Sequence, residues 1–536
     1  MRWIPTLLTL CLVGCSGEAV TPSKQESTPP TTAAIPAELW PEGAVALIVI
    51  PSAERLEEAL LEAGALFTDE PAPFPTDGAE LLALAGAAGD LTQLDPSRPI
   101  AVALLMQPGP TPAFVLPVRD GERFRAPLAG SDTPVHLVGD YALVGAAPGD
   151  GTAGLAADLP DGLLVLRLDM AALGPLVAPM IDPLLASTAV DETVPGFDMG
   201  GLMESFGALA REFIASSRTL DLALGWEDGR LIFDGHLALV PESSLAEWIH
   251  DGPTGAAELA RSIDPDASMM FAGGLDPSVL RAKLLPWAHE LFKAYPEPLR
   301  ESLRTSLEQL ETQYDLVGRA FAGSQHFGKD GLRYTYLLDP DNAEAVMESL
   351  VSSFCSTPFL GNTEAEAQRS EEDGIHLIRV PVVFDAEALA ATLGESPDEL
   401  DAQEFENAMQ GVFGEGLELV VGRRDGYVAA QVGTGPGVRE TLDRARAGGP
   451  PPPPLMPLLT EFGDANPLFV GRLDVASMLR GAMEVASEML GEDAPEVPAG
   501  APVELTFFAA GKDQSVRFGF RFDMAAMARL VEAMDR

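Results

Sequence analysis

The side chains that most often do chemistry in proteins are few and scattered along this chain. Of the six histidines, His289 with Glu290 matches the first two positions of the His-Glu-x-x-His zinc motif. The second histidine of that motif would stand where the chain has Lys293, so the motif fails. No Cys-x-x-Cys pair and no Gly-x-Ser-x-Gly elbow occurs in the sequence. The sequence therefore predicts no metal site and no cofactor, and it favours a protein without catalytic activity.

Three weaker patterns resemble functional motifs but also have ordinary structural explanations. The run from Gly433 to Val438 has valine where a dinucleotide fingerprint needs its third glycine, so it predicts a turn before a helix. The acidic runs Glu364–Asp373 and Asp339–Asn342 lack the residue order of an EF-hand loop, which favours solvated surface over calcium binding. Methionines give a faint hint of an apolar ligand pocket, although methionine fills cores more often. They are Met478, Met483 and Met489.

A site assembled from residues far apart in the chain leaves no local pattern in one sequence. One structural observation would therefore support a catalytic function. It is a cleft that holds a buried histidine–carboxylate pair with a strongly perturbed pKa.

The charge of the chain limits its partners. Its 536 residues include 34 Lys and Arg against 81 Asp and Glu, which gives a formal net charge of −47. A surface this acidic repels DNA, RNA and anionic lipid head groups, so we expect no nucleic-acid partner. Hydrophobic residues make up 46% of the chain, which is enough to bury a core.

The N-terminus carries the most specific motif. Met1-Arg2 is positively charged, and Trp3 to Val13 is an apolar stretch too short to span a bilayer. It ends in Leu12-Val13-Gly14-Cys15, which resembles the lipobox of bacterial lipoproteins. The resemblance implies cleavage of a signal peptide before Cys15 and acylation of Cys15, with palmitate among the acyl chains. Ser16 is similar to the pattern that directs lipoproteins to the outer membrane, so a periplasm-facing anchor there is implied.

The three cysteines are consistent with a lipidated N-terminus. Cys11 would leave with the signal peptide, and Cys15 would hold the lipid. Cys355 would then be alone, so we expect no internal disulfide and a small apolar role for Cys355. Residues 15–38 are rich in Pro, Ser and Thr and predict a flexible tether.

The rest of the chain repeats one order of elements. A strand ends in aspartate, helices follow, and a hairpin with an acidic turn closes the segment, as at Asp228-Gly229 and Asp425-Gly426. The recurring aspartates are predicted to cap helices, because a carboxylate can accept a bond from an unpaired N–H of the first turn. They are Asp169, Asp276, Asp385, Asp474 and Asp523.

These patterns predict an α+β fold of tandem degenerate strand–helix–helix–hairpin units with mostly antiparallel sheets. Helices such as the one carrying Leu202, Phe206, Leu209 and Phe213 should cover one face of a sheet. Pro450 to Pro454 should form a stiff spacer or hinge. The expected segments are a signal peptide (1–14), the tether (15–38), units at 39–158, 159–255, 256–358 and 359–447, a polyproline linker (448–457) and a last unit (458–536).

The body of the chain is similar only to uncharacterised bacterial envelope lipoproteins, so two functions stay open. The first is a non-catalytic, lipid-anchored interaction or scaffold module that presents surfaces to other envelope proteins. The alternative is a periplasmic carrier of an apolar or lipid ligand, which needs an apolar cavity of roughly 300 Å3 or more. The sequence favours the first, because helix-on-sheet packing accounts for every apolar stripe and aromatic residues make up only 7% of the chain.

Overall fold

The computed structural model describes most of the chain from residue 35 onward. The described residues are 35–66, 89–106, 109–149, 159–188, 199–250, 255–274, 281–282, 285–293, 300, 304, 320–328, 331–356, 366–383, 412–414, 417–461, 466–490, 497–498, 500 and 502–534. The predicted signal peptide, Cys15 and most of the predicted tether lie outside them, as do Asp276 and Asp385.

The chain divides into two compact units, each built from three stretches or fewer. Unit 1 comprises Met1–Pro175, Ser217–Ala238 and Gly519–Arg536, and unit 2 comprises Leu176–Ser216 and Leu239–Phe518. All the strand registers described are antiparallel, and helices connect many of the strands. The predicted α+β class with antiparallel strands is therefore confirmed.

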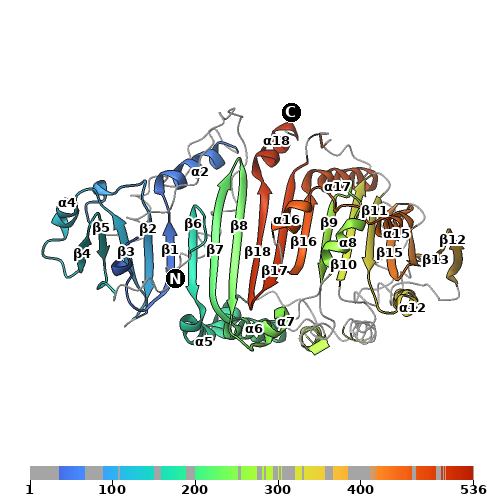
Figure 1. Cartoon of the computed structure of the whole chain (residues 1–536), viewed down its shortest axis with the longest axis horizontal. Coiled ribbons are helices and arrows are strands. Elements are labelled where there is room, and N and C mark those ends of the chain that lie inside the picture. Colours follow the sequence, from blue (N-terminus) through green and yellow to red (C-terminus); the bar gives the residue numbers. More distant parts are fainter. Residues whose placement is uncertain are drawn as a thin grey trace. The chain divides into compact units, whose positions relative to one another are not determined.

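Unit 1 contains a sheet whose strands pair in the order β4-β5-β3-β2-β1-β6-β7 (Figure 1). A further pairing joins β8 to β18. The strands are β1 (Ala44–Ile50), β2 (Ile100–Leu105), β3 (Thr111–Pro117), β4 (Val135–Val138), β5 (Tyr141–Val144), β6 (Leu164–Asp169), β7 (Ser217–Glu227), β8 (Arg230–Leu239) and β18 (Ser515–Asp523). The helices are α2 (Ala53–Ala65), α4 (Gly121–Arg125) and α18 (Met524–Met534), with short 3-10 turns at Ala37–Leu39, Leu91–Gln93 and Ala126–Leu128.

Unit 2 contains strands that pair in the order β17-β16-β9-β10-β11-β15-β14-β13-β12. They are β9 (Met269–Gly274), β10 (Ala320–Gly328), β11 (Gly331–Leu338), β12 (Gln368–Glu372), β13 (Ile375–Pro381), β14 (Glu418–Arg424), β15 (Tyr427–Gly433), β16 (Asn466–Asp474) and β17 (Glu504–Lys512). The helices are α6 (Met199–Ser216), α7 (Ser244–His250), α8 (Ala256–Leu259), α10 (Leu285–Phe292), α12 (Ala343–Cys355), α15 (Gly437–Ala447), α16 (Met456–Glu461) and α17 (Val475–Leu490), with a 3-10 turn at Ala260–Ser262. Helix α5 (Met170–Thr188) begins in unit 1 and continues in unit 2.

The recurring aspartates cap helices, as the sequence predicts. In each case a carboxylate oxygen accepts a hydrogen bond from the backbone N–H three residues further on, which satisfies a donor that the helix itself leaves unpaired. The bonds run from Ala172 to Asp169 (3.0 Å), from Ser477 to Asp474 (3.2 Å) and from Ala526 to Asp523 (2.7 Å). The prediction is confirmed at these three positions.

The predicted hairpin turns are also found. Asp and Gly take positive φ at both central positions, which matches the twist of the flanking strands. The values are 51° and 75° at Asp228-Gly229 and 52° and 92° at Asp425-Gly426. The same geometry at Asp373-Gly374, between β12 and β13, was not singled out in the sequence.

The compact units of the structure do not follow the five expected segment boundaries. Strands from different expected units pair directly: β1 with β6, β9 with β16, and β11 with β15. These pairings join segments that the sequence boundaries separate, because hydrogen bonding between strands does not depend on their distance along the chain. The strands therefore merge into two larger compact units.

The polyproline segment packs against the core of unit 2. Pro452 is buried, and the neighbouring Leu455 is completely buried in the core of unit 2. The carbonyl oxygen of Pro452 accepts hydrogen bonds from the backbone N–H groups of Leu455 (3.0 Å) and Met456 (3.2 Å). These contacts place the segment as the lead-in to α16 inside unit 2.

The expectation that helices cover one face of a sheet fails in β13, β14 and β15. Helix α15 packs on one face and α12 on the other, since successive strand residues belong to different core clusters. Val420 packs in the cluster of Leu442, whereas Val421 packs in the cluster of Met347. Burial on both faces explains the uninterrupted apolar runs at 419–421 and 428–430.

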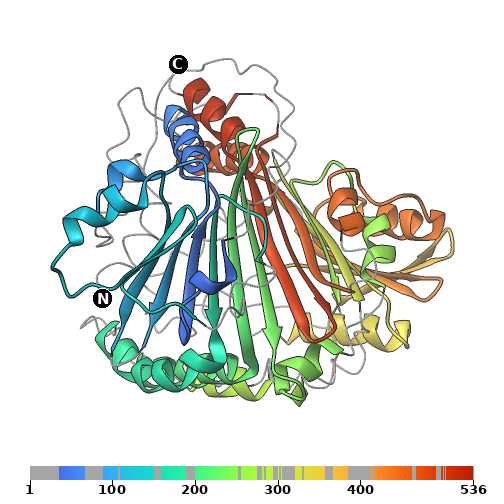
Figure 2. The same cartoon turned by 60° about the vertical axis from the view of Figure 1, so that its left-hand side comes forward.

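The apolar stripe of α6 does not pack on a sheet either. Phe206, Leu209 and Phe213 are 39–44% exposed, while Gly207 on the opposite side is buried. In α5, three large apolar side chains are exposed to a similar degree: Leu176, Val177 and Met180. Figure 1 labels α5 and α6 near the same edge of the picture, and Figure 2 shows the same cartoon from another side. We call these six side chains the α5–α6 apolar face.

Candidate functional site

A cavity of about 420 Å3 lies within unit 2, where helix α17 approaches strands β10 and β11. Its lining is mostly polar and charged, and it includes Asp266, Ser268, His326, Arg333, Arg480 and Glu484. A smaller cavity of about 230 Å3 shares Asp266, Ser477 and Arg480 with it. This arrangement is the candidate functional site of the chain.

The hairpin of β10 and β11 supplies one wall of the cavity. His326 on β10 stands directly opposite Arg333 on β11 in the antiparallel register. Directly paired residues project on the same face of a sheet, so this register brings the imidazole and the guanidinium to one side. The sequence did not indicate that these two residues form part of a site.

Helix α17 supplies the facing wall. Ser477, Arg480, Gly481 and Glu484 follow the three-to-four-residue spacing of one helix face. Gly481 permits the close approach, because a Cβ at this position would lie 2.8 Å from the carbonyl carbon of Phe327. The spacing of these polar residues could have indicated the site from the sequence. In the sequence, only the methionines of this helix were considered, as possible lining of an apolar pocket.

Asp264 is the centre of a charged cluster beside the cavity. Its Oδ2 lies 3.2 Å from Nε2 of His326, 3.3 Å from Nη2 of Arg444 and 3.9 Å from Nη2 of Arg333. Its Oδ1 accepts a hydrogen bond of 3.1 Å from the backbone N–H of Asp266. One carboxylate, with its side chain 13% exposed, thus serves three basic side chains.

The surroundings strongly favour the ionised form of Asp264. The adjacent His326 imidazole makes the largest contribution to lowering the pKa of this carboxyl well below its ordinary value. Burial opposes the shift, and the Asp266 N–H and the Arg444 charge add to it. Asp264 is therefore a fixed negative charge under ordinary conditions.

Two arginines of the cavity retain unused hydrogen-bonding capacity. Arg480 donates from Nη2 to the carbonyl oxygen of Pro498 at 3.3 Å, and its buried Nε has no hydrogen-bond partner within the described chain. The buried Nε of Arg333 also lacks one there, and the nearest carboxylate oxygen is that of Asp264 at 3.9 Å. Both guanidinium groups thus line the cavity without a closely bonded carboxylate among the described residues.

The His326–Asp264 pair is the kind of observation that reopens the case for an enzyme. It lies at a cavity, and the pKa of its carboxyl is strongly perturbed. However, among the described residues no hydroxyl or thiol group forms a hydrogen bond with His326, and the hydroxyl of Ser477 donates instead to Asp474 at 2.7 Å. The described geometry therefore provides a charge cluster without an activated nucleophile.

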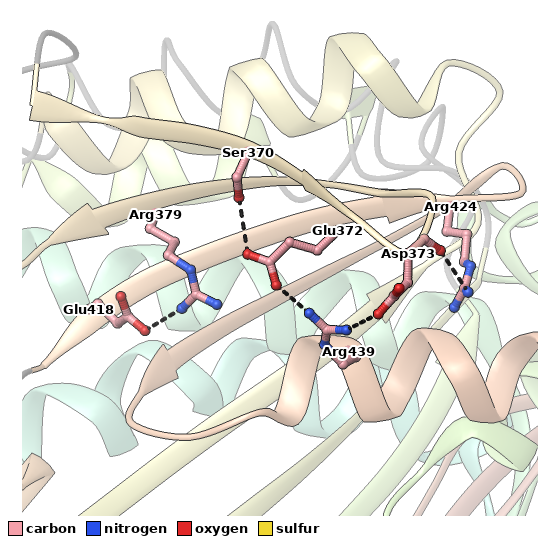
Figure 3. Close-up of polar contacts among 7 residues, drawn as sticks. All are labelled: Ser370, Glu372, Asp373, Arg379, Glu418, Arg424 and Arg439. Carbon is pink, nitrogen blue, oxygen red and sulfur yellow. Dashed lines mark hydrogen bonds and ion pairs between the residues drawn. The ribbon is translucent and has the colours of Figure 1, made fainter.

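The acidic run near residue 370 is held by arginines (Figure 3). Glu372 and Asp373, at the end of β12, both form ion pairs with Arg439 of α15, the second at 2.6 Å. Arg424 also donates a hydrogen bond of 3.1 Å to the carbonyl oxygen of Asp373. These bonds tie the edge hairpin to α15, and no metal-type group of three His, Cys, Asp or Glu occurs within the described part of the chain.

Other residues singled out in the sequence take different places. Cys15 lies outside the described residues, as does the side chain of Met489. Cys355 is the last residue of α12, and it is partly buried against the core cluster of that helix. Met478 and Met483 lie on α17 and are half-buried, but the cavity beside this helix is lined by charged groups.

Comparisons with known proteins add little to this geometry. No protein-family model matches the chain, and no curated protein matches it. The solved structure of crystal form III of TP0453 aligns with 52% of this chain and 98% of its own, at 8% identity and a TM-score of 0.24. A likeness this low carries no argument about fold or function. Within the described residues, no helix has the length and apolar character needed to cross a membrane.

Proposed function

We propose that this chain is a lipid-anchored protein of the bacterial cell envelope that acts, without catalysis, as an interaction module for other envelope proteins. The resemblance of Leu12–Cys15 to a lipobox supports the anchor, and Ser16 supports an outer-membrane location facing the periplasm. The α5–α6 apolar face carries the proposal that the chain interacts with a protein partner.

The α5–α6 apolar face is unusual for a chain of this charge. Its six large apolar side chains are 39–45% exposed, and Asp182 is the single charged residue between Met170 and Thr188. Exposed apolar area costs about 25 cal/mol per Å2 relative to burial, and contiguous patches mark interaction sites. A partner that covered this face would recover that free energy.

The composition of the two helices favours a protein over a lipid surface as the partner. Helices that lie on membranes carry Lys and Arg along their polar side, whereas α5 has neither and α6 has only Arg211. The net charge of −47 also opposes attraction to anionic lipids. An apolar surface on a second protein fits these conditions.

The proposal also includes an origin of the fold from repeated units. We propose that tandem degenerate units, each a strand, helices and a hairpin, built the chain. The succession β6, α5, α6, β7 and β8 resembles the succession β16, α17, β17 and β18, and an aspartate caps the first helix after the leading strand in both. These units would have merged through pairing of their strands.

A carrier of an apolar or lipid ligand remains the alternative function. It requires an apolar cavity, and the cavity of about 420 Å3 is lined instead by arginines, acids and a histidine. Neither this cavity nor the smaller one beside it has the apolar lining that a carrier needs, so the interaction module is preferred.

The partner can be tested by native electrophoresis of envelopes solubilised in mild detergent. The chain should migrate within a larger complex, and Leu176→Ser with Leu209→Ser should release it as a monomer. The matched control is Leu60→Ser with Leu61→Ser on α2, which removes two equally exposed leucines from unit 1. A wild-type monomer, a homodimer, or equal release by the control would contradict the proposal.

The anchor is tested separately through Cys15. Cys15→Ser should abolish acylation and move the chain from the detergent phase to the aqueous phase on phase separation, because acyl chains supply the membrane affinity. Retention of the Cys15→Ser chain in the detergent phase would refute the anchor.

A further inference from the structure

We propose that the cavity of unit 2 binds a small molecule through a carboxylate or phosphate group held between Arg333 and Arg480. This site goes beyond the interaction module and does not depend on it. The oxyanion would complete a hydrogen-bonding environment that the two guanidinium groups leave unfinished.

The first support is the contrast between Arg480 and its neighbour Arg472. The buried Nε of Arg472 also lacks a partner among the described residues, but its Nη2 contacts Glu504 at 3.2 Å and its Nη1 the carbonyl oxygen of Ala267 at 3.3 Å. Within the described part of the chain, Arg480 contacts one carbonyl oxygen, that of Pro498, and no carboxylate. In a chain with more than two acidic residues for each basic one, a cavity arginine that has no carboxylate partner among the described residues indicates a missing anion.

The second support is the way in which Asp264 is already engaged. His326 and Arg444 approach its Oδ2 to 3.2 and 3.3 Å, whereas Arg333 remains at 3.9 Å. The nearer groups take the best positions around this oxygen, so Arg333 keeps its donors for another acceptor. Guanidinium groups bind planar carboxylates and phosphates through paired hydrogen bonds, which fits a ligand oxyanion in this place.

The rim of the cavity limits what enters. Asp266 and Glu484 both line the cavity and are exposed. Their negative charges disfavour polyanions, so a molecule with one oxyanion group fits best. A volume of about 420 Å3 is that of a small-molecule site.

Calorimetric titration of the full chain with glycerol 3-phosphate and with acetate tests the proposal. Saturable binding of at least one probe is expected, and Arg480→Gln and Arg333→Gln should each weaken it about tenfold or more, since each removes a charge-assisted hydrogen bond. Arg261→Gln is the matched control, because Arg261 is an exposed arginine of the same unit. It should leave the binding unchanged.

A second kind of variant distinguishes loss of the binding site from loss of folding in the arginine variants. Glu484→Gln alters an exposed side chain and should tighten the binding of glycerol 3-phosphate, because it removes a negative charge from the rim. The source of the oxyanion is tested with the Cys15→Ser chain and vesicles of phosphatidylglycerol in phosphatidylcholine. Vesicle binding that Arg480→Gln abolishes assigns a lipid head group, and binding of the soluble probe alone assigns a free molecule.

Both of those outcomes support an oxyanion site. The proposal is overturned if neither soluble probe nor the vesicles bind to the wild-type chain at about 10 mM ligand. It is equally overturned if Arg261→Gln weakens the binding as much as Arg480→Gln does.

Discussion

Replacement of Asp264 by asparagine tests how much the charged cluster stabilises unit 2. The substitution keeps the size of the side chain and an acceptor for the Asp266 N–H, but it removes the charge that His326, Arg444 and Arg333 share. Loss of one partner from a buried ion pair costs about 3–5 kcal/mol. Because Asp264 keeps 13% exposure and the more exposed arginines can turn to solvent, we expect a loss of about 2–3 kcal/mol in the free energy of unfolding.

The pH dependence gives this prediction a second readout. The folded-state pKa of Asp264 lies below the ordinary value of 3.8, so on acidification the unfolded chain binds this proton first. The stabilisation by Asp264 is therefore complete well above pH 3.8 and falls as the pH drops below it. The difference between wild type and Asp264→Asn should be full at neutral pH and should shrink towards about pH 3.

Urea unfolding followed by circular dichroism at both pH values measures the difference. Asp266→Asn is the control, since Asp266 is exposed and forms no ion pair with the described residues. It should change the free energy of unfolding by less than about 0.5 kcal/mol. A loss below about 0.5 kcal/mol for Asp264→Asn at neutral pH, or a loss that persists unchanged in acid, would refute the reasoning.

Two further predictions concern the turns and the edge hairpin. Gly229→Ala should destabilise unit 1 by about 2–3 kcal/mol, because φ is +75° and the new Cβ would lie 2.6 Å from that of Ala525. Gly426→Ala, with φ +92° and open space around it, should cost only about 1 kcal/mol, and equal unfolding midpoints would contradict the steric part of this explanation. Arg439→Gln should cost about 1 kcal/mol at low salt, with hydrogen exchange accelerated in β12, since it removes both ion pairs of the edge hairpin. The effect should diminish in about 1 M salt, and an effect independent of salt would rule out the ionic origin.

The sequence predicted the features that neighbouring residues determine. The caps at Asp169 and Asp474 and the turn at Asp228-Gly229 depend on contacts within a few residues, so their residue types indicate them directly. The number of compact units could not be predicted in this way. It depends on pairings such as β9 with β16, between segments that lie far apart in the chain.

Periodicity also identified the apolar stripe of α6 correctly as a stripe. Periodicity does not tell what the stripe contacts, because the same pattern occurs in helices that pack on a core, bind a partner or bind a ligand. Leu209 is exposed and Gly207 is buried, which reverses the expected orientation.

The pocket was missed for a related reason. Asp264 precedes β9, His326 lies on β10, and Arg444 lies on α15, so no local motif joins them. Only the spacing of Ser477, Arg480 and Glu484 on one face of α17 marked a polar helix surface.

Photo-crosslinking from position 209 is the most direct test of the proposed interaction module. A photoreactive residue replaces Leu209 in the anchored chain within its own envelope, and Asp425, an exposed turn residue of unit 2, is the control position. The account predicts a discrete adduct with another envelope protein from position 209 and none from position 425. Lipid adducts from position 209, or an equal spread of adducts from both positions, would contradict it.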